Sequence, residues 1–187
     1  DLYGTHHVAP RIHPGDAEAL ASHPVDFLGV NYYFPNRVYA SDAGGLLGYE
    51  VGQLKDVQRT AMGWEVHPDG LCDLLLRLKA DYGDPAVFIT ENGAAFDDRR
   101  VQNGQVQDDD RIGYLDGHLR AMRRAIGHGV KVQGYFLWSL LDNFEWAFGT
   151  SRRFGITHVD FATQARTWKK SAGWYRHVIA TNGGALA

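Results

Sequence analysis

The sequence predicts an α/β fold, because short apolar segments alternate along the chain with amphipathic helical patterns. Three strand candidates are rich in β-branched and aromatic residues, as buried strands are: residues 25–33, 86–90 and 130–138. Parallel neighbours are usually joined by a helix, so we expect parallel β-α units. A closed (β/α)8 TIM barrel uses eight units over about 250 residues, so three units in 187 residues are less than half of one.

Helices are expected between and after these strands. Apolar residues recur with a period of about 3.6 residues from Pro68 and again from Asp110, which predicts two amphipathic helices. A final helix is predicted from Ser171, as its N-cap, to Gly183-Gly184, and a short helix over residues 14–21. The expected apolar faces of the two long helices are Leu71, Leu74, Leu75 and Leu78, and Ile112, Leu115, Leu119, Met122 and Ile126.

The composition excludes several classes of partner. Net charge is −3 and no basic run is present, so the sequence predicts no nucleic-acid partner and no membrane partner. No apolar run approaches the roughly 20 residues of a membrane span. Cys72 is the single cysteine, which favours a reducing compartment, and we expect a cytoplasmic location. No metal-binding spacing occurs, so we expect neither a metal nor another cofactor.

Glu91 is the most informative residue of the chain. It follows the second strand directly, in the segment V-F-I-T-E-N-G. Parallel barrels keep their chemistry at the carboxyl ends of strands, and long connections, residues 34–63 and 94–109, follow two of the predicted strands as active-site loops do. Glu91 is therefore a candidate nucleophile. The alternative is that Glu91 begins an ordinary loop, with Asn92 and Gly93 turning the chain.

The other two strands also end in polar and aromatic residues. Asn31, Tyr32 and Tyr33 end the first strand, and W-S-L-L-D-N-F-E-W, which contains Glu145, follows the third. A carboxylate between aromatic rings suits a sugar, because the carboxylate accepts hydrogen bonds from hydroxyls while an indole covers the ring face. The alternative is a packed core segment with satisfied polar groups. Because all three strand ends should meet on one face, we favour a carbohydrate site.

Several motifs together resemble family-one glycoside hydrolases, the β-glucosidase family. They are F-L-G-V-N-Y-Y, M-G-W-E-V-H-P-D-G-L, F-I-T-E-N-G, D-D-x-R-I-x-Y-L, G-Y-F-L-W-S-L-L-D-N-F-E-W and R-F-G-I. The resemblance covers most of the chain and corresponds to the last three β-α units of that family's barrel. It implies that Glu91 is the nucleophile that forms a glycosyl-enzyme intermediate. It also implies that Tyr33 orients Glu91 and that Asn31 lies near the sugar's 2-hydroxyl.

The resemblance further implies a set of substrate-binding residues. Trp138 would lie beneath the non-reducing sugar, and Glu145 would accept hydrogen bonds from its 4- and 6-hydroxyls. Trp146 would donate to the 3-hydroxyl, and Phe154 would line the 6-hydroxyl side. Relatives that cleave 6-phosphorylated sugars usually have serine at the position of Glu145, since an acid repels phosphate. The substrate implied is an unphosphorylated β-glucoside or short β-linked oligosaccharide, and the resemblance does not distinguish glucose, galactose and fucose as the glycone.

One catalytic group of the family has no counterpart in the sequence. A retaining glycosidase needs a second carboxyl about 5 to 5.5 Å from the nucleophile, and none of the five glutamates stands in the family's N-E-P motif. Residues 1–187, which do not begin with methionine, are thus expected to be the C-terminal portion of a β-glucosidase, inactive without the N-terminal half of the barrel. We expect that half, or self-association, to cover the sheet. Alternatives are a non-catalytic carbohydrate-binding fragment and a thioglucosidase-like relative that lacks the acid/base.

Overall fold

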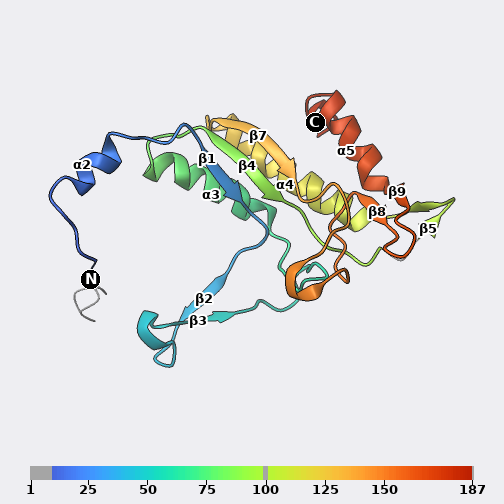
Figure 1. Ribbon diagram of the computed structural model, residues 1–187, viewed down its shortest axis with the longest axis horizontal. Helices are drawn as coiled ribbons and strands as arrows, with labels where there is room; N and C mark the ends of the chain where they lie inside the picture. Colours follow the sequence, from blue (N-terminus) through green and yellow to red (C-terminus); the bar gives the residue numbers. More distant parts are fainter. Residues whose placement is uncertain (1–9, 99–100, 187) are drawn as a thin grey trace.

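A three-stranded parallel sheet forms the centre of the computed structural model, which describes residues 10–98 and 101–186. Its strands are β1 (Leu28–Asn31), β4 (Val87–Asn92) and β7 (Val132–Leu137), in the order β1-β4-β7 (Figure 1). The three predicted strands and their parallel arrangement are confirmed. β4 continues two residues beyond the predicted segment and therefore includes Glu91 and Asn92.

Helices α3 (Pro68–Asp81) and α4 (Asp109–Gly127) cover one face of this sheet, and α5 (Lys170–Ala180) follows β7 and packs against α4 (Figure 1). Alternate strand residues meet the helices: Val30, Val87 and Ile89 pack on Leu71 and Leu75 of α3, together with alanines of α4. This cluster, which also contains the buried Cys72, is the core predicted from the helical periodicity. None of the helices in the described segments is long and apolar enough to cross a membrane.

Two details of the predicted helices are wrong. Ile126 was expected on the apolar face of α4 but is 44% exposed, because in the last turn of the helix Ala125, and not Ile126, packs into the core cluster. Ser171 was expected to be the N-cap of the final helix, whereas the N-cap is Lys169. Ser171 lies inside the first turn of α5, where its buried hydroxyl donates to Asp108. The short helix α2 (Asp16–Ala21) begins two residues after the predicted start.

The connections contain hairpins that the sequence analysis read as loops. β2 (Arg37–Ala40) and β3 (Tyr49–Gly52) pair around the 3-10 helix η1 (Gly45–Leu47), and β5 (Val101–Gln102) pairs with β6 (Gln105–Val106). β8 (Thr157–Val159) and β9 (Arg166–Trp168) form a third hairpin before α5. Asn103 and Gly104 have φ values of 50° and 74°, the left-handed turn geometry that an Asn-Gly pair favours between two strands.

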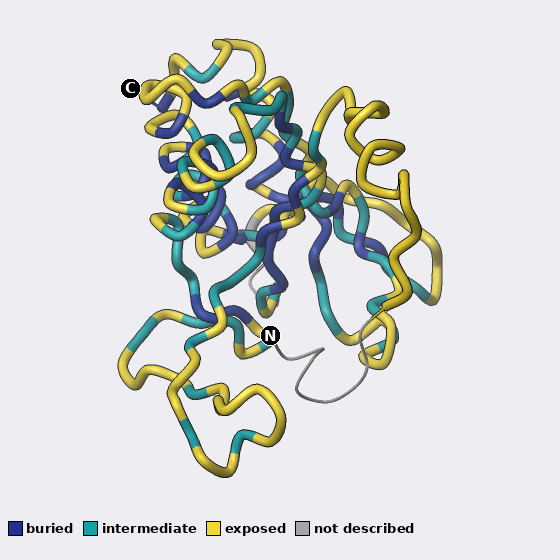
Figure 2. The backbone as a smooth tube through the Cα atoms, turned by 90° about the vertical axis from the view of Figure 1, so that its left-hand side faces the viewer, coloured by how far each residue is buried: buried dark blue, intermediate teal, exposed yellow. Residues whose placement is uncertain are grey.

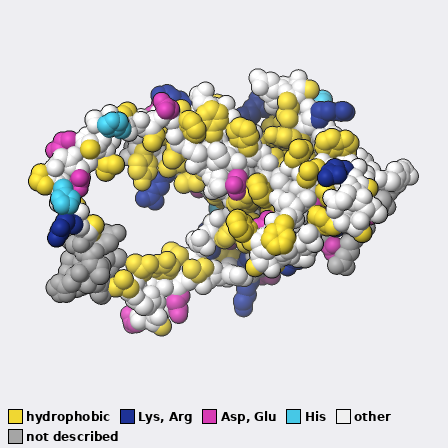
Figure 3. Space-filling view, in the orientation of Figure 1, with side chains coloured by type: hydrophobic (Ala, Val, Ile, Leu, Met, Phe, Trp, Pro, Cys, Tyr) yellow, Lys and Arg dark blue, Asp and Glu magenta, His cyan; other side chains and the backbone are white. Residues whose placement is uncertain are grey.

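The second face of the sheet lacks a helical cover among the described residues. Gly29, Thr90 and Phe136, which alternate with the core residues, are exposed, and Phe88 makes ring contacts with Phe27 and Phe136 on this face. Figure 2 shows burial concentrated in the centre of the molecule and a largely exposed β2–β3 arm. In Figure 3 apolar side chains line the edge of that arm that faces the sheet across open space. The described residues thus form a partial α/β barrel in which no helix of theirs covers the interior face.

His118 of α4 makes the stability of this fold dependent on pH. Its fully buried ring stacks on Tyr114 at 3.9 Å between ring centroids, and its Nδ1 lies 2.7 Å from the Tyr114 carbonyl oxygen, so that nitrogen carries the proton. Burial lowers the pKa of His118 from 6.5 to about 4. The folded state therefore holds a neutral ring at pH values where the unfolded chain binds a proton.

We expect the free energy of unfolding to fall as the pH decreases from 7 to 4. The unfolded chain gains a proton at His118 below about pH 6.5 and the folded protein only near pH 4, so stability is lost across this window. At pH 5 the loss from this residue is about 2 kcal/mol. Urea unfolding at pH 7 and pH 5 measures it. A His118→Phe variant should show a smaller difference between the two pH values, and an unchanged difference would contradict this account.

Candidate active site

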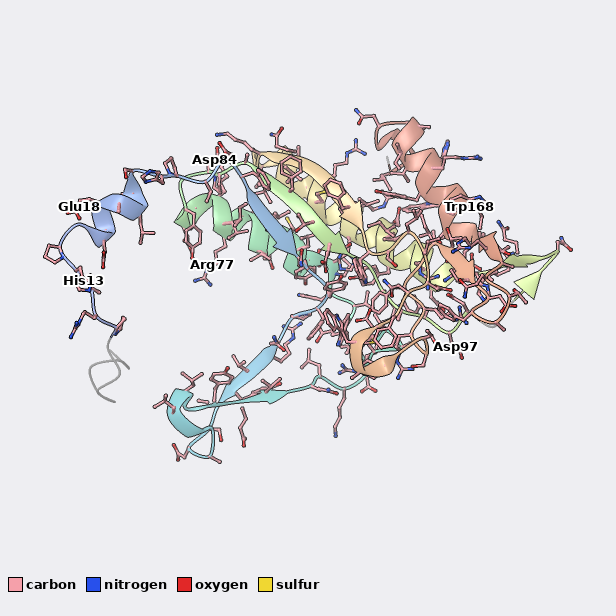
Figure 4. All side chains as sticks on the ribbon, viewed as in Figure 1. His13, Glu18, Arg77, Asp84, Asp97 and Trp168 are labelled. Carbon is pink, nitrogen blue, oxygen red and sulfur yellow. The ribbon has the colours of Figure 1, made fainter. Side chains whose placement is uncertain are left out.

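The carboxyl ends of β1 and β4 bring the predicted catalytic residues together. The Tyr33 hydroxyl donates a hydrogen bond of 2.7 Å to Oε2 of Glu91. A register shift after Val30 places Asn31 opposite Glu91, and Thr90 Oγ1 donates to Asn31 Oδ1 at 2.7 Å. Such irregularities redirect side chains at strand ends. Figure 4 labels Asp84 ahead of β4 and Asp97 beyond its carboxyl end, so the site lies at the Asp97 end of the sheet.

Burial and charge set the protonation of the residues around Glu91. Burial raises the pKa of Tyr33, and the hydrogen bond to Glu91 and the negative charges of Glu91 and Glu145 raise it further, so the phenol stays neutral and donates. Burial also raises the pKa of Glu145; a hydrogen bond from the side chain of Trp138 opposes that rise, and the charge of Glu91 adds to it. Glu91, Tyr33 and Glu145 therefore share one electrostatic environment.

Gly93 allows the end of β7 to pack against the end of β4. The backbone N–H of Trp138 donates to the carbonyl of Asn92 at 2.9 Å, and a Cβ atom added at Gly93 would lie 1.7 Å from the carbonyl oxygen of Trp138. No side chain fits there, because the obstructing atom belongs to the backbone. The glycine of T-E-N-G thus serves this close approach. The Trp138–Ser139 peptide bond, at the same place, is cis.

The predicted substrate-binding residues occupy three different environments. Trp138 and Glu145 belong to the group around Glu91. Trp146 is the first residue of the 3-10 helix η2 (Trp146–Phe148) and is 83% exposed. Phe154 is buried behind Tyr33, with their rings edge to face at 6.3 Å. The structure therefore brings together Asn31, Tyr33, Glu91, Trp138 and Glu145, leaves Trp146 in solvent, and places Phe154 in the wall that supports Tyr33.

Trp64 is an aromatic neighbour of the site to which the sequence analysis gave no role. Its ring lies 5.3 Å from that of Tyr33 and 6.0 Å from that of Phe154, and it stacks on Phe34 at 4.8 Å. Phe34 and Trp64 also line a pocket that contains the ion pair between Arg37 and Glu65. The available signal was the tryptophan in M-G-W-E-V-H-P-D-G-L, in the connection that returns from β3 to α3.

A buried network of charges supports the loops around the site. Lys169 Nζ donates to Asp142 at 2.7 Å and also contacts Asp98, while Arg111 contacts Asp98 at 3.1 Å and also contacts Asp108. Arg111 and Lys169 are almost fully buried, as are the side chains of the three acids. Asp108 is the N-cap residue of α4, but its side chain makes no capping hydrogen bond. Its carboxylate instead joins this network.

Asp142 anchors the segment that carries Glu145. Its carboxylate also accepts hydrogen bonds from Arg153 at 2.9 Å and from the backbone N–H of Gly155 at 3.0 Å. Burial alone would raise the pKa of Asp142, but the charge of Lys169 and the hydrogen bonds from Lys169 and Arg153 lower it below its ordinary value. Within residues 10–98 and 101–186, no group of three or more His, Cys, Asp or Glu side chains could hold a metal ion.

Comparison with known proteins places this arrangement in a family. The family model of glycosyl hydrolase family 1 matches residues 2–184. Beta-glucosidase A of Thermotoga maritima is 48% identical over 160 residues, which cover 85% of this chain and 35% of the relative. The bifunctional beta-D-glucosidase/beta-D-fucosidase of Bifidobacterium breve is 45% identical over 184 residues, covering 89% of this chain and 39% of the relative.

A solved structure shows the same partial correspondence. The Thermotoga maritima beta-glucosidase in complex with deoxynojirimycin matches with a TM-score of 0.80 and 47% identity, covering 86% of this chain and 36% of that protein. The chain thus spans little more than a third of the length of these relatives. The motifs, the parallel β-α units and the position of Glu91 at a strand end agree with this match. The chain belongs to glycosyl hydrolase family 1.

Proposed function

We propose that this chain is the C-terminal portion of a retaining β-glucosidase and supplies its nucleophile, Glu91. The observation that carries the proposal is the hydrogen bond from Tyr33 to Glu91 at the carboxyl ends of parallel strands. In this mechanism Glu91 attacks the anomeric carbon and forms a covalent glycosyl-enzyme, which water then hydrolyses. The Tyr33 hydroxyl fixes the attacking oxygen, and Asn31 faces the 2-hydroxyl of the sugar.

The glycone site of this proposal uses Trp138, Glu145, Trp146 and Phe154. Trp138 supports the sugar ring from below, and its indole holds the carboxylate of Glu145 as an acceptor for the 4- and 6-hydroxyls. A negative charge at Glu145 repels a 6-phosphate, so the substrate is unphosphorylated. Glucose, galactose and fucose differ at the 4- and 6-positions, which are the positions that the Glu145 carboxylate contacts in this proposal. The Bifidobacterium breve relative is a bifunctional beta-D-glucosidase/beta-D-fucosidase, which supports a glycone site that accepts more than one of these sugars.

The acid/base of this mechanism lies outside the chain, in an N-terminal half of the barrel that completes the sheet. The exposed face of β1, β4 and β7, with Phe27, Phe88 and Phe136, is the surface that this half would cover. The same exposed apolar surface favours a second candidate function, a carbohydrate-binding or self-associating fragment without catalysis.

Complementation separates the two functions. The chain by itself should not hydrolyse 4-nitrophenyl β-glucoside, because it lacks the acid/base. Co-expressed with the N-terminal portion that carries the family's N-E-P motif, it should form a complex with activity. An inactive complex of correct stoichiometry would favour the non-catalytic function. Hydrolysis by the chain alone, lost in its Glu91→Gln variant, would show that the acid belongs to this chain, with Glu145 as the first candidate.

A further inference from the structure

Asn92, the neighbour of Glu91, links β4 to β7, to α4 and to the residues that follow β1, through its side chain and backbone. Its Nδ2 donates to the Tyr32 carbonyl at 2.7 Å and to the Tyr114 hydroxyl at 3.1 Å. Its Oδ1 accepts from the Tyr135 hydroxyl at 2.6 Å. Successive strand residues point to opposite faces, so Glu91 enters the site while Asn92 enters the core. The amide is fully buried, and both protons and one oxygen lone pair of its side chain are used.

The chain of hydrogen bonds ends on the backbone of Tyr33. The Tyr114 hydroxyl accepts from Asn92 and donates its single proton to the Tyr33 carbonyl at 3.1 Å. Burial raises the pKa of Tyr114 and of Tyr135, so both phenols keep the protons that this arrangement needs. The direction of donation is consistent along the whole series, from Tyr135 through Asn92 and Tyr114 to Tyr33.

Tyr33 needs this support because it lies beyond the sheet. β1 ends at Asn31, and the last backbone bond across to β4 runs from the Tyr32 N–H to the Glu91 carbonyl at 2.9 Å. The rings of Trp64 and Phe154 contact the phenol ring of Tyr33, at 5.3 and 6.3 Å between ring centroids, but they do not hold its backbone. The carbonyl groups of Tyr32 and Tyr33 are therefore held by side chains from β4 and α4.

We propose that Asn92, Tyr114 and Tyr135 form a positioning network that holds the Tyr33 hydroxyl on the nucleophile Glu91. The inference rests on the proposed function, since Glu91 must be the reacting group for its position to matter to the rate. A displacement of about 1 Å in a reacting group can cost about 100-fold in rate. Removal of the Tyr114 hydroxyl, which releases Tyr33 directly, should therefore lower the rate more than removal of the Tyr135 hydroxyl, which lies two bonds further away.

The test uses the complete enzyme, with this chain joined to its N-terminal half, and 2,4-dinitrophenyl 2-deoxy-2-fluoro-β-glucoside. This substrate releases one dinitrophenolate per active site, so the burst amplitude counts folded sites and the rate constant describes each site. We expect the rate constant to fall about 10- to 100-fold in Tyr114→Phe and less in Tyr135→Phe. Tyr175→Phe, a matched control whose ring lies 6.4 Å from that of Tyr135, should keep the wild-type value.

Combination with Tyr33→Phe separates a positioning role from a general loss of stability. If the network acts through Tyr33, Tyr114→Phe should reduce the rate constant less than about twofold further in the Tyr33→Phe background. Fully additive losses, or no loss in the single variant, would overturn the inference. A full burst from Glu91→Gln would instead overturn the proposed function, and this inference with it, whereas an abolished burst there with additive losses overturns the network alone.

Discussion

Replacement of Glu91 by Gln is expected to reduce β-glucoside hydrolysis by the complete enzyme on the order of 10⁶-fold, the scale seen when a catalytic nucleophile is removed. Gln has nearly the same shape and still accepts a hydrogen bond from Tyr33, but its amide oxygen carries no negative charge with which to attack the anomeric carbon. Steady-state kinetics with an aryl β-glucoside measure the effect. The loss should appear in kcat rather than in KM alone, because binding of the sugar does not need the charge.

Glu50→Gln is a matched control for this substitution. Glu50 lies on the exposed strand β3, away from the strand ends that form the site, and its variant should retain wild-type kinetics. The folded fraction of each variant is checked by circular dichroism. A Glu91→Gln enzyme that keeps more than about a tenth of wild-type kcat would show that another group attacks the sugar.

The second large effect is expected from Lys169→Met, on stability. Lys169 has no exposed surface, and its ammonium group contacts Asp98 and Asp142. Its removal leaves two buried carboxylates with part of their compensating charge missing. The free energy of unfolding should fall by about 3 to 5 kcal/mol, the usual cost when one partner of a buried ion pair is removed. Urea unfolding, followed by tryptophan fluorescence, measures the loss.

The neighbouring residue supplies the control for that experiment. Lys170 also pairs with an aspartate, Asp109, but both side chains are 46% exposed. An exposed pair contributes at most about 1 kcal/mol, so Lys170→Met should change the free energy of unfolding by no more than that. Equal losses from the two substitutions would contradict a special role for the buried network.

Short segments rich in β-branched and aromatic residues were sufficient to predict the sheet, and the period of the apolar residues was sufficient to predict the helices that cover it. It failed where a tertiary contact outweighs a local preference. Ser171 looks like a helix N-cap in the sequence, but its hydroxyl bonds to Asp108, which is 63 residues away in the chain. The hairpins β2–β3 and β5–β6 were missed because their strands are short and lie inside long connections. The Asn103-Gly104 pair was a readable turn signal for the second of them.

Part of the candidate site could also be predicted from the sequence and part could not. Glu91 and Glu145 were predicted from the polar and aromatic segments at or after strand ends, and the role of Tyr33 followed from the family resemblance. The groups that hold them were not predicted. Asn92 was considered only as a turn residue, although its amide bonds to Tyr32 and Tyr135 across separations of 60 and 43 residues. Hydrogen bonds between residues so far apart in the chain do not change the spacing of apolar residues in the sequence. Only the folded structure therefore shows which polar residues of the motifs are buried.

Identification of the residue that carries the sugar tests the central claim most directly. The complete enzyme is treated with 2,4-dinitrophenyl 2-deoxy-2-fluoro-β-glucoside, digested, and its peptides sequenced by mass spectrometry. The account predicts one added fluoroglucosyl group per active enzyme, attached to Glu91 through an ester bond. A label on Glu145 or on any other residue, with Glu91 unmodified, would contradict it.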